Sequence, residues 1–123
     1  MSGKLEITKS FTFEAAHHFR QMPEGHPYRR LHGHSFVAEI TLSGPPDSEM
    51  GWVTDFAEVD RALDGVRNRL DHNLLNEIEG LENPSLENLA MWIARQLRPI
   101  LPALTRVTVR RPSCGEACTF IPE

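Results

Sequence analysis

The sequence has few cysteines and no long hydrophobic run, and each shortage excludes a class of protein. Two cysteines, Cys114 and Cys118, in 123 residues are too few for the disulfide framework of a small secreted domain. No apolar stretch approaches the ~20 residues that a membrane-spanning helix needs. The first ten residues also lack the apolar core of a signal peptide. We therefore expect a cytoplasmic protein with no membrane partner.

Positive charge is also scarce. Thirteen lysines and arginines stand against 17 aspartates and glutamates, for a net charge of −4 and a pI near 5.8. We expect no nucleic acid partner, because contacts to a phosphate backbone require an excess of basic residues. The remaining composition, 40 % hydrophobic and 24 % charged, is that of an ordinary globular protein. Its length suits one hydrophobic core, so we expect a single domain over residues 1–123.

Alternation of apolar and polar residues predicts strands at both ends of the chain. Apolar residues take the odd positions over residues 11–19 and the even positions over residues 32–42, as in half-buried strands. The same alternation predicts a strand over residues 105–109, and a weaker pattern indicates a short one over residues 118–120. Loops rich in proline and glycine follow the first two strands.

The middle of the chain has the period of a helix instead. Apolar residues spaced three or four apart predict one helix over residues 56–70, with Asp55 as its N-cap and Glu58 completing a capping box. Ser85 is expected to cap a second helix over residues 86–97.

The order strand, strand, helix, helix, strand, strand predicts an α+β fold. In it, a four-stranded antiparallel sheet carries both helices on one face. Such a sheet has two open edges, and an open edge favours pairing with another copy of the chain. We therefore expect a homo-oligomer.

Five of the six histidines fall between residues 17 and 34. His32 and His34 leave the same face of one predicted strand, and His17 shares the parity of the apolar residues on the other. If these strands are neighbours, three imidazoles converge on the buried face, where protonated rings are costly and neutral rings leave nitrogens unpaired. The alternative is a set of core histidines held by hydrogen bonds. We favour a zinc ion on His17, His32 and His34, with its fourth position open to water or substrate.

Asp71 and His72 follow the first predicted helix directly. A carboxylate beside a histidine orients a general base. An Asp-His pair at a helix end is also ordinary C-terminal capping chemistry, and the spacing alone leaves both interpretations open.

Four motifs resemble those of the 6-pyruvoyl-tetrahydropterin synthase family. They are Phe13-Glu14-Ala15-Ala16-His17, Leu31-His32-Gly33-His34-Ser35-Phe36, Leu70-Asp71-His72 and Leu81-Glu82-Asn83-Pro84-Ser85. The resemblance runs from about residue 5 to residue 110 and is strongest to the bacterial 6-carboxytetrahydropterin synthase branch, which serves queuosine synthesis. It implies the tunnelling fold (T-fold), whose subunits join sheet edges into rings. It also implies a homohexamer of two stacked trimers, with active sites at subunit interfaces.

The resemblance further implies a reaction. The small-molecule substrate would be the pterin 7,8-dihydroneopterin triphosphate, and a lyase reaction would release triphosphate and acetaldehyde to give 6-carboxytetrahydropterin. Zinc would act as a Lewis acid on the substrate side chain. The residues that match the family's functional positions are the zinc ligands His17, His32 and His34 and the proton-relaying pair Asp71 and His72. We also expect Ser85 and Glu87, at the start of the second predicted helix, to contact substrate.

Two positions depart from the family pattern. Tyr28 stands four residues before the His-x-His motif, where family members place their main proton-transferring cysteine. A phenol, with a pKa of ~10, begins further from neutrality than a thiol at ~8.5. Arg111 stands where the family has a glutamate that binds the pterin, and a guanidinium has donors only. We expect Tyr28 to act in catalysis, and Glu116 to supply the carboxylate beside Arg111.

These departures leave two functions open. One is a zinc-dependent pterin synthase that transfers protons through Tyr28, His72 or a relocated cysteine, although Cys114 and Cys118 are more simply interpreted as reduced thiols of a terminal segment. The other is a paralogue that keeps the zinc and the oligomer but binds or converts a different pterin-like or acidic ligand. Arginines near the pocket would favour an acidic ligand; they are Arg29, Arg30 and Arg111.

Overall fold

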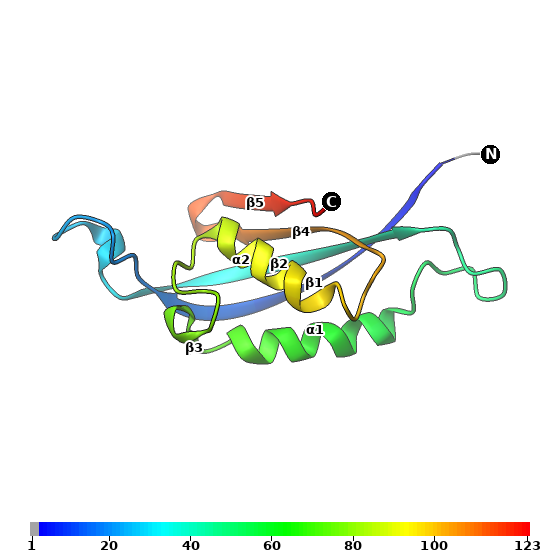
Figure 1. Cartoon of the computed structure of the whole chain (residues 1–123), viewed down its shortest axis with the longest axis horizontal. Helices are drawn as coiled ribbons and strands as arrows, with labels where there is room; N and C mark the ends of the chain where they lie inside the picture. The colour runs from blue at the N-terminus through cyan, green and yellow to red at the C-terminus, as the bar shows by residue number, and fades with distance from the viewer. Residues whose placement is uncertain (1–2) are drawn as a thin grey trace.

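A five-stranded sheet with two helices on one face forms the fold (Figure 1). The computed structural model describes residues 3–123. The elements follow in the order β1 (Leu5–His17), η1 (Pro27–Arg29), β2 (His32–Gly44), α1 (Phe56–Leu70), β3 (Asn73–Leu74), η2 (Leu75–Glu77), α2 (Leu86–Leu97), β4 (Leu104–Arg111), η3 (Pro112–Cys114) and β5 (Glu116–Phe120). The η elements are short 3₁₀ helices. This arrangement confirms the predicted α+β class.

The strand count corrects the prediction of four antiparallel strands. The sheet order is β3-β1-β2-β4-β5, and β3 pairs in parallel with β1 at one edge. β3 has only two residues, too few to show an alternating pattern. The other strands pair antiparallel, as expected. β1 also begins at Leu5, before the predicted start at Phe11, because its ladder with β2 extends as far as Gly44.

The core lies between the sheet and the two helices. Phe13 of β1 and Phe36 of β2 are neighbours across the ladder, and both are 1 % exposed. Their rings stack with centroids 4.8 Å apart. The helices add apolar stripes, namely Val59, Leu63, Val66 and Leu70 in α1 and Leu89, Ala90, Ile93 and Leu97 in α2. Burial of each of the larger side chains stabilises the fold by roughly 1.5–3 kcal/mol. This burial favours the register of β1 and β2 on which the site depends.

Both helices begin at the caps that the sequence predicts. The Asp55 carboxylate accepts from the Ala57 N–H at 2.9 Å, and the Ser85 hydroxyl accepts from the Asn88 N–H at 3.1 Å. The Ser85 cap matters for function, because it fixes the turn from which α2 starts, immediately beside the histidine cluster.

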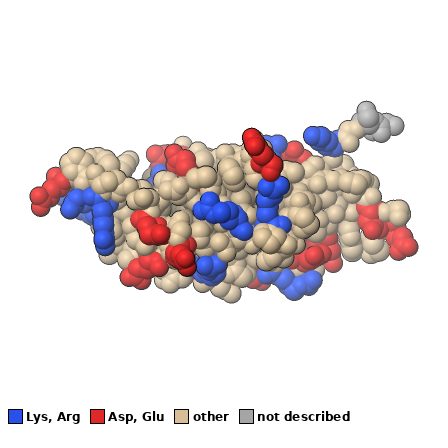
Figure 2. All heavy atoms as spheres, viewed as in Figure 1, with Lys and Arg blue, Asp and Glu red and all other residues tan. Residues whose placement is uncertain are grey.

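The molecule is elongated, and its two ends differ (Figure 1). The connection between β1 and β2, residues 18–31, projects beyond the helices at the end opposite the N-terminus. Lysines and arginines are interspersed with acidic residues over the face in Figure 2. Within residues 3–123, none of the helices has the length and apolar character needed to cross a membrane.

Candidate functional site

Three histidines meet at the end of the β1–β2 hairpin, as their parity predicts. His17 is paired with His32 across the ladder, and Ala15 with His34. One ring nitrogen from each histidine lies within 4.8 Å of the other two. His17 is fully buried, whereas His32 and His34 are half-buried. The cluster therefore has a closed side at His17 and an open side at the other two rings.

Backbone carbonyls orient two of the three imidazoles. His17 Nδ1 lies 3.2 Å from the Pro84 oxygen, and His32 Nδ1 lies 2.7 Å from the Arg30 oxygen. A carbonyl only accepts hydrogen bonds, so each Nδ1 carries the proton and each Nε2 presents a lone pair. The two Nε2 atoms are 2.9 Å apart. Two lone pairs at this distance repel unless a cation lies between them, so the donor set fits a zinc ion.

The electrostatic environment favours the neutral form of His17 and His34. The pKa of His17 is lowered to about 4, chiefly by burial; the hydrogen bond with the Pro84 carbonyl opposes this shift, and the charges of neighbouring groups add to it. Burial also lowers the pKa of His34, with the Arg111 guanidinium as the next cause. Neutral imidazole is the form that binds metal. Both histidines are therefore favoured in the form that binds a metal ion at neutral pH.

A cavity of about 330 Å³ opens over His32 and His34. Its walls come from two distant parts of the chain, the β1–β2 connection and the turn between β4 and β5. The lining side chains with functional groups are Tyr28, Arg30, Arg111, Cys114 and Glu116. The structure thus brings Tyr28, Arg111 and Glu116, all predicted site residues, to the histidine cluster.

Tyr28 lies at the mouth of this cavity and is 52 % exposed. Its ring lies roughly parallel to the His32 ring, with centroids 6.4 Å apart. His26 holds the turn in place, because its Nδ1 accepts from the Tyr28 N–H at 3.1 Å. The Tyr28 ring therefore lies beside the histidine cluster but remains accessible from solvent.

Arg111 and Glu116 form an ion pair on the opposite wall, at 3.0 Å. Antiparallel pairing of β4 with β5 places them directly opposite each other. The Arg111 side chain is 17 % exposed, and its Nε is buried with no hydrogen-bond partner among residues 3–123. Glu116 is half-exposed and lines the cavity. The pair therefore offers a carboxylate acceptor where Arg111 alone would offer only donors.

Ser85 and Glu87 lie at the start of α2. The Ser85 hydroxyl is engaged as the helix cap, and the preceding Pro84 carbonyl contacts His17. Glu87 lines a neighbouring cavity of about 480 Å³ that Glu116 also borders. This turn therefore positions the histidine cluster through Pro84, while Glu87 faces the space next to it.

The two cysteines lie in different surroundings. Cys114 borders the cavity over the histidines, and its Sγ lies 3.9 Å from His34 Nδ1. Cys118 lies on β5 in the neighbouring cavity, where burial, followed by the charge of Glu87, raises the pKa of its thiol. The sequence allowed either thiol to approach the zinc pocket, and the structure places Cys114 beside the histidine cluster.

Asp71 and His72 form a hydrogen-bonded pair beside β3. The Asp71 carboxylate accepts from the Glu14 N–H and from His72 Nδ1, each at 2.8 Å, and these bonds lower the Asp71 pKa. His72 has a left-handed backbone with φ of +59°, which is costly for a residue other than glycine. Its side chain is 79 % exposed, with Nε2 free to exchange a proton. Asp71 is also the C-cap residue of α1, so the pair lies at a helix end, and its catalytic role stays a prediction.

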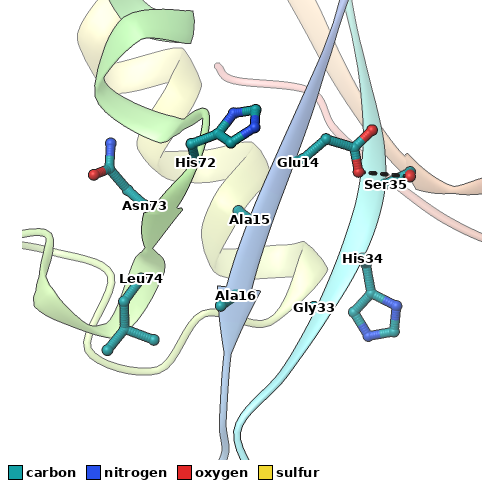
Figure 3. Close-up of a pocket in the computed structure, with 9 residues that line it drawn as sticks. All are labelled: Glu14, Ala15, Ala16, Gly33, His34, Ser35, His72, Asn73 and Leu74. Carbon is teal, nitrogen blue, oxygen red and sulfur yellow. Dashed lines mark hydrogen bonds between the residues drawn. The ribbon is translucent and has the colours of Figure 1, made fainter.

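Within one chain, His72 lies at a different cavity (Figure 3) from the one that Tyr28, Arg111 and Glu116 line. His72 borders a cavity of about 500 Å³ that His34, Glu14 and Ser35 also line. The parity of Glu14 and Ser35 places them on the face of the sheet without helices. The Glu14 carboxylate accepts from the Ser35 hydroxyl at 2.6 Å there. The His34 ring extends away from His72. The predicted site residues therefore line two cavities, and His34 borders both.

This chain resembles known proteins over nearly its whole length. The family model described as 6-pyruvoyl tetrahydropterin synthase matches residues 6–123. Dihydroneopterin monophosphate aldolase of Pyrococcus furiosus is 35 % identical over 95 % of this chain and 94 % of its own. The 6-carboxy-5,6,7,8-tetrahydropterin synthase of Synechocystis sp. is 41 % identical over 94 % and 93 %. The structure of Caenorhabditis elegans 6-pyruvoyl tetrahydropterin synthase superposes with a TM-score of 0.87 at 22 % identity, covering 98 % of this chain and 97 % of that one.

Proposed function

This chain belongs to the 6-pyruvoyl tetrahydropterin synthase family and has its T-fold, and on that premise we propose that it is a zinc-dependent lyase acting on a dihydroneopterin phosphate. The related proteins described above are named for pterin chemistry. The observation that carries the proposal is the pair of facing Nε2 atoms, 2.9 Å apart, at the floor of a cavity with polar walls. The preferred reaction is that of 6-carboxytetrahydropterin synthase, on 7,8-dihydroneopterin triphosphate.

His17, His32 and His34 would hold the metal. When bound, zinc polarises the oxygen atoms of the substrate side chain as a Lewis acid. The chain contributes the orientation of the ligands, because carbonyl oxygens fix two of the rings before any metal arrives. Burial of His17 also removes competition from protons near neutral pH.

Glu116 and Arg111 are the proposed groups for binding the pterin ring. A pterin edge carries N–H donors that a carboxylate accepts, and the ion pair holds the Glu116 carboxylate at the cavity wall. Arg30 lies at the mouth of the same cavity, where a guanidinium suits the phosphate groups of the substrate. Glu87 and Ser85 border the adjoining turn and complete the proposed binding wall.

Proton transfer is assigned to His72, oriented by Asp71, with Tyr28 as a second group beside the metal position. Asp71 fixes the His72 Nδ1 proton, so Nε2 accepts or donates at the substrate. His72 lines a different cavity from Tyr28, Arg111 and Glu116 of its own chain, and a second copy would bring its Asp71–His72 pair to that cavity. We therefore propose a homo-oligomer with its active sites between subunits, in the form of two stacked trimers.

An aldolase reaction is the second candidate. The Pyrococcus furiosus relative of that name favours it, as does a tyrosine where the thiol would stand. The reaction breaks the bond between the first two side-chain carbons. A base takes the proton of the second carbon's hydroxyl, which becomes the aldehyde, and an acid returns a proton to the first carbon. Because no oxidation occurs, one histidine such as His72 can serve as both base and acid.

The test is to incubate zinc-loaded protein with 7,8-dihydroneopterin triphosphate or monophosphate and to identify products by mass spectrometry. A synthase releases acetaldehyde and 6-carboxytetrahydropterin, whereas an aldolase releases glycolaldehyde phosphate and 6-hydroxymethyl-dihydropterin. His72→Asn is the matched variant, because asparagine tolerates the left-handed backbone but transfers no proton. Loss of turnover in His72→Asn, with zinc still bound, supports the proposal. Zinc bound stoichiometrically without turnover of either substrate would refute it in favour of a binding protein for another ligand.

A further inference from the structure

Cys114 is a cavity residue to which the proposed reaction gives no role. It lies in η3, between β4 and β5, and its exposed thiol borders the cavity over the histidines. Its Sγ is 3.9 Å from His34 Nδ1, although the two residues are 80 positions apart. The turn between β4 and β5 therefore places the Cys114 sulfur beside the Nδ1 atom of His34.

The three clustered histidines share one arrangement at Nδ1. In His17 and His32, this nitrogen faces a backbone carbonyl, from Pro84 and Arg30. Each ring therefore turns its Nε2 toward the centre of the cluster. Among residues 3–123, the hydrogen-bond partner of the His34 ring is the Cys114 sulfur, again at Nδ1. A thiol sulfur is a weak acceptor, so it can perform for His34 what the two carbonyls perform for the other rings.

We propose that Cys114 is a positioning residue of the metal centre, whose Sγ accepts a hydrogen bond from His34 Nδ1 and so directs His34 Nε2 to the metal. The inference rests on the proposed zinc site. Groups that hold the outer nitrogen of a ligating histidine fix its tautomer and ring orientation, and they strengthen metal binding through the ligand.

The local backbone holds the thiol in this position. Gly115 follows Cys114 with φ of +68°, in the left-handed region that favours glycine, and its N–H donates to the Pro112 oxygen at 3.1 Å. The ion pair of Arg111 with Glu116 closes the turn from both sides. These interactions therefore fix the conformation of the turn, and with it the position of the Cys114 thiol.

The distances favour this role over direct coordination. The group of ligand atoms that lie within 4.8 Å of one another comprises the three histidines and does not include Cys114. A tetrahedral zinc ion would bring a ligating sulfur to about 3.5 Å from every nitrogen, given the usual bond lengths. The contact of Cys114 Sγ is with His34 Nδ1, at 3.9 Å, and this is the ring nitrogen that the proposal turns away from the metal.

Cobalt(II) binding followed by absorption spectroscopy tests the proposal. We expect Cys114→Ala to bind cobalt about 10–100-fold more weakly than the unaltered protein, and Cys114→Ser to stay within a few-fold because its hydroxyl also accepts. Cys118→Ala, which removes the other thiol of the same hairpin, is the control and should leave the affinity unchanged. The spectrum of the unaltered protein should lack an intense near-ultraviolet thiolate-to-cobalt band.

Two results would overturn the proposal. Equal affinity of Cys114→Ala and the unaltered protein would make the thiol irrelevant to the metal centre. A thiolate-to-cobalt band that disappears in Cys114→Ser would make the sulfur a direct ligand. Thermal unfolding of the metal-free variants checks that each is folded. No pterin takes part in these measurements, so they separate this inference from failure of the proposed reaction.

Discussion

Acidification of the metal-free protein should destabilise it through His17, and the size of the effect follows from burial. An unfolded chain protonates this histidine near pH 6.5, whereas the folded protein keeps it neutral down to about pH 4. Between these values the unfolded state binds more protons, so the free energy of unfolding falls as the pH falls. The contribution is fully present above pH 6.5 and is lost progressively toward pH 4.

The expected loss is about 3 kcal/mol, from about 1.4 kcal/mol for each pH unit across this interval. His34 adds to it in the same direction, because its pKa is also lowered. Asp71 contributes little here, since its pKa lies below the ordinary carboxylate value of 3.8 and its effect is lost only at lower pH.

Urea unfolding in the presence of a chelator, at several pH values from 7 to 4, measures this loss. His17→Gln is the matched variant, because glutamine does not titrate and still offers an N–H to the Pro84 carbonyl. The difference in unfolding free energy between the two proteins isolates the histidine, and it should shrink by about 3 kcal/mol as the pH falls. A difference independent of pH would refute the reasoning. The NMR titration of the His17 ring provides a direct check, and a pKa near 6.5 would contradict the assigned burial.

Three further predictions concern the site. Ser85→Ala should lower the free energy of unfolding by about 1 kcal/mol, as measured by urea titration. It should also weaken cobalt binding, as measured by absorption spectroscopy, because the capped turn carries the Pro84 carbonyl that contacts His17. Glu116→Gln should weaken pterin binding at least about tenfold, seen by pterin fluorescence. Glu39→Gln, which breaks an ion pair on the other face of the sheet, should leave that binding unchanged. Mixed oligomers of His72→Asn and His32→Ala subunits should recover turnover that neither variant has alone, and no recovery would contradict a site between subunits.

The histidine cluster could be predicted from the sequence because its residues lie on strands. Strand alternation fixes which face a side chain leaves, so parity alone is enough to place His17, His32 and His34 on one face of the sheet. The same logic predicts Phe13 and Phe36 in the core. The local sequence pattern is sufficient to predict these positions because β1 and β2 are consecutive in the sequence and pair with each other.

The surroundings of the cluster could not be predicted in this way. The oxygens of Pro84 and Arg30 belong to the backbone, and a carbonyl has no sequence signature. The approach of Cys114 to His34 depends on the register of β4 and on a turn closed by Gly115, which are tertiary features. β3 could not be predicted because two residues carry no period, and the position of His72 directly before this strand could not be predicted either.

The position of His17 and His32 at the two ends of the β1–β2 connection has a consequence for that segment. The two residues are 15 positions apart, and a metal ion joining them closes the intervening chain into a ring, as a disulfide would. Cross-linking a ring of this length removes about 3 kcal/mol of loop entropy from the unfolded chain. The cross-linked segment carries Tyr28 and Arg30 over the cavity. Metal binding would therefore restrict the motion of the β1–β2 connection over the cavity. Proteolytic cleavage within residues 18–31 should become faster when the ion is removed.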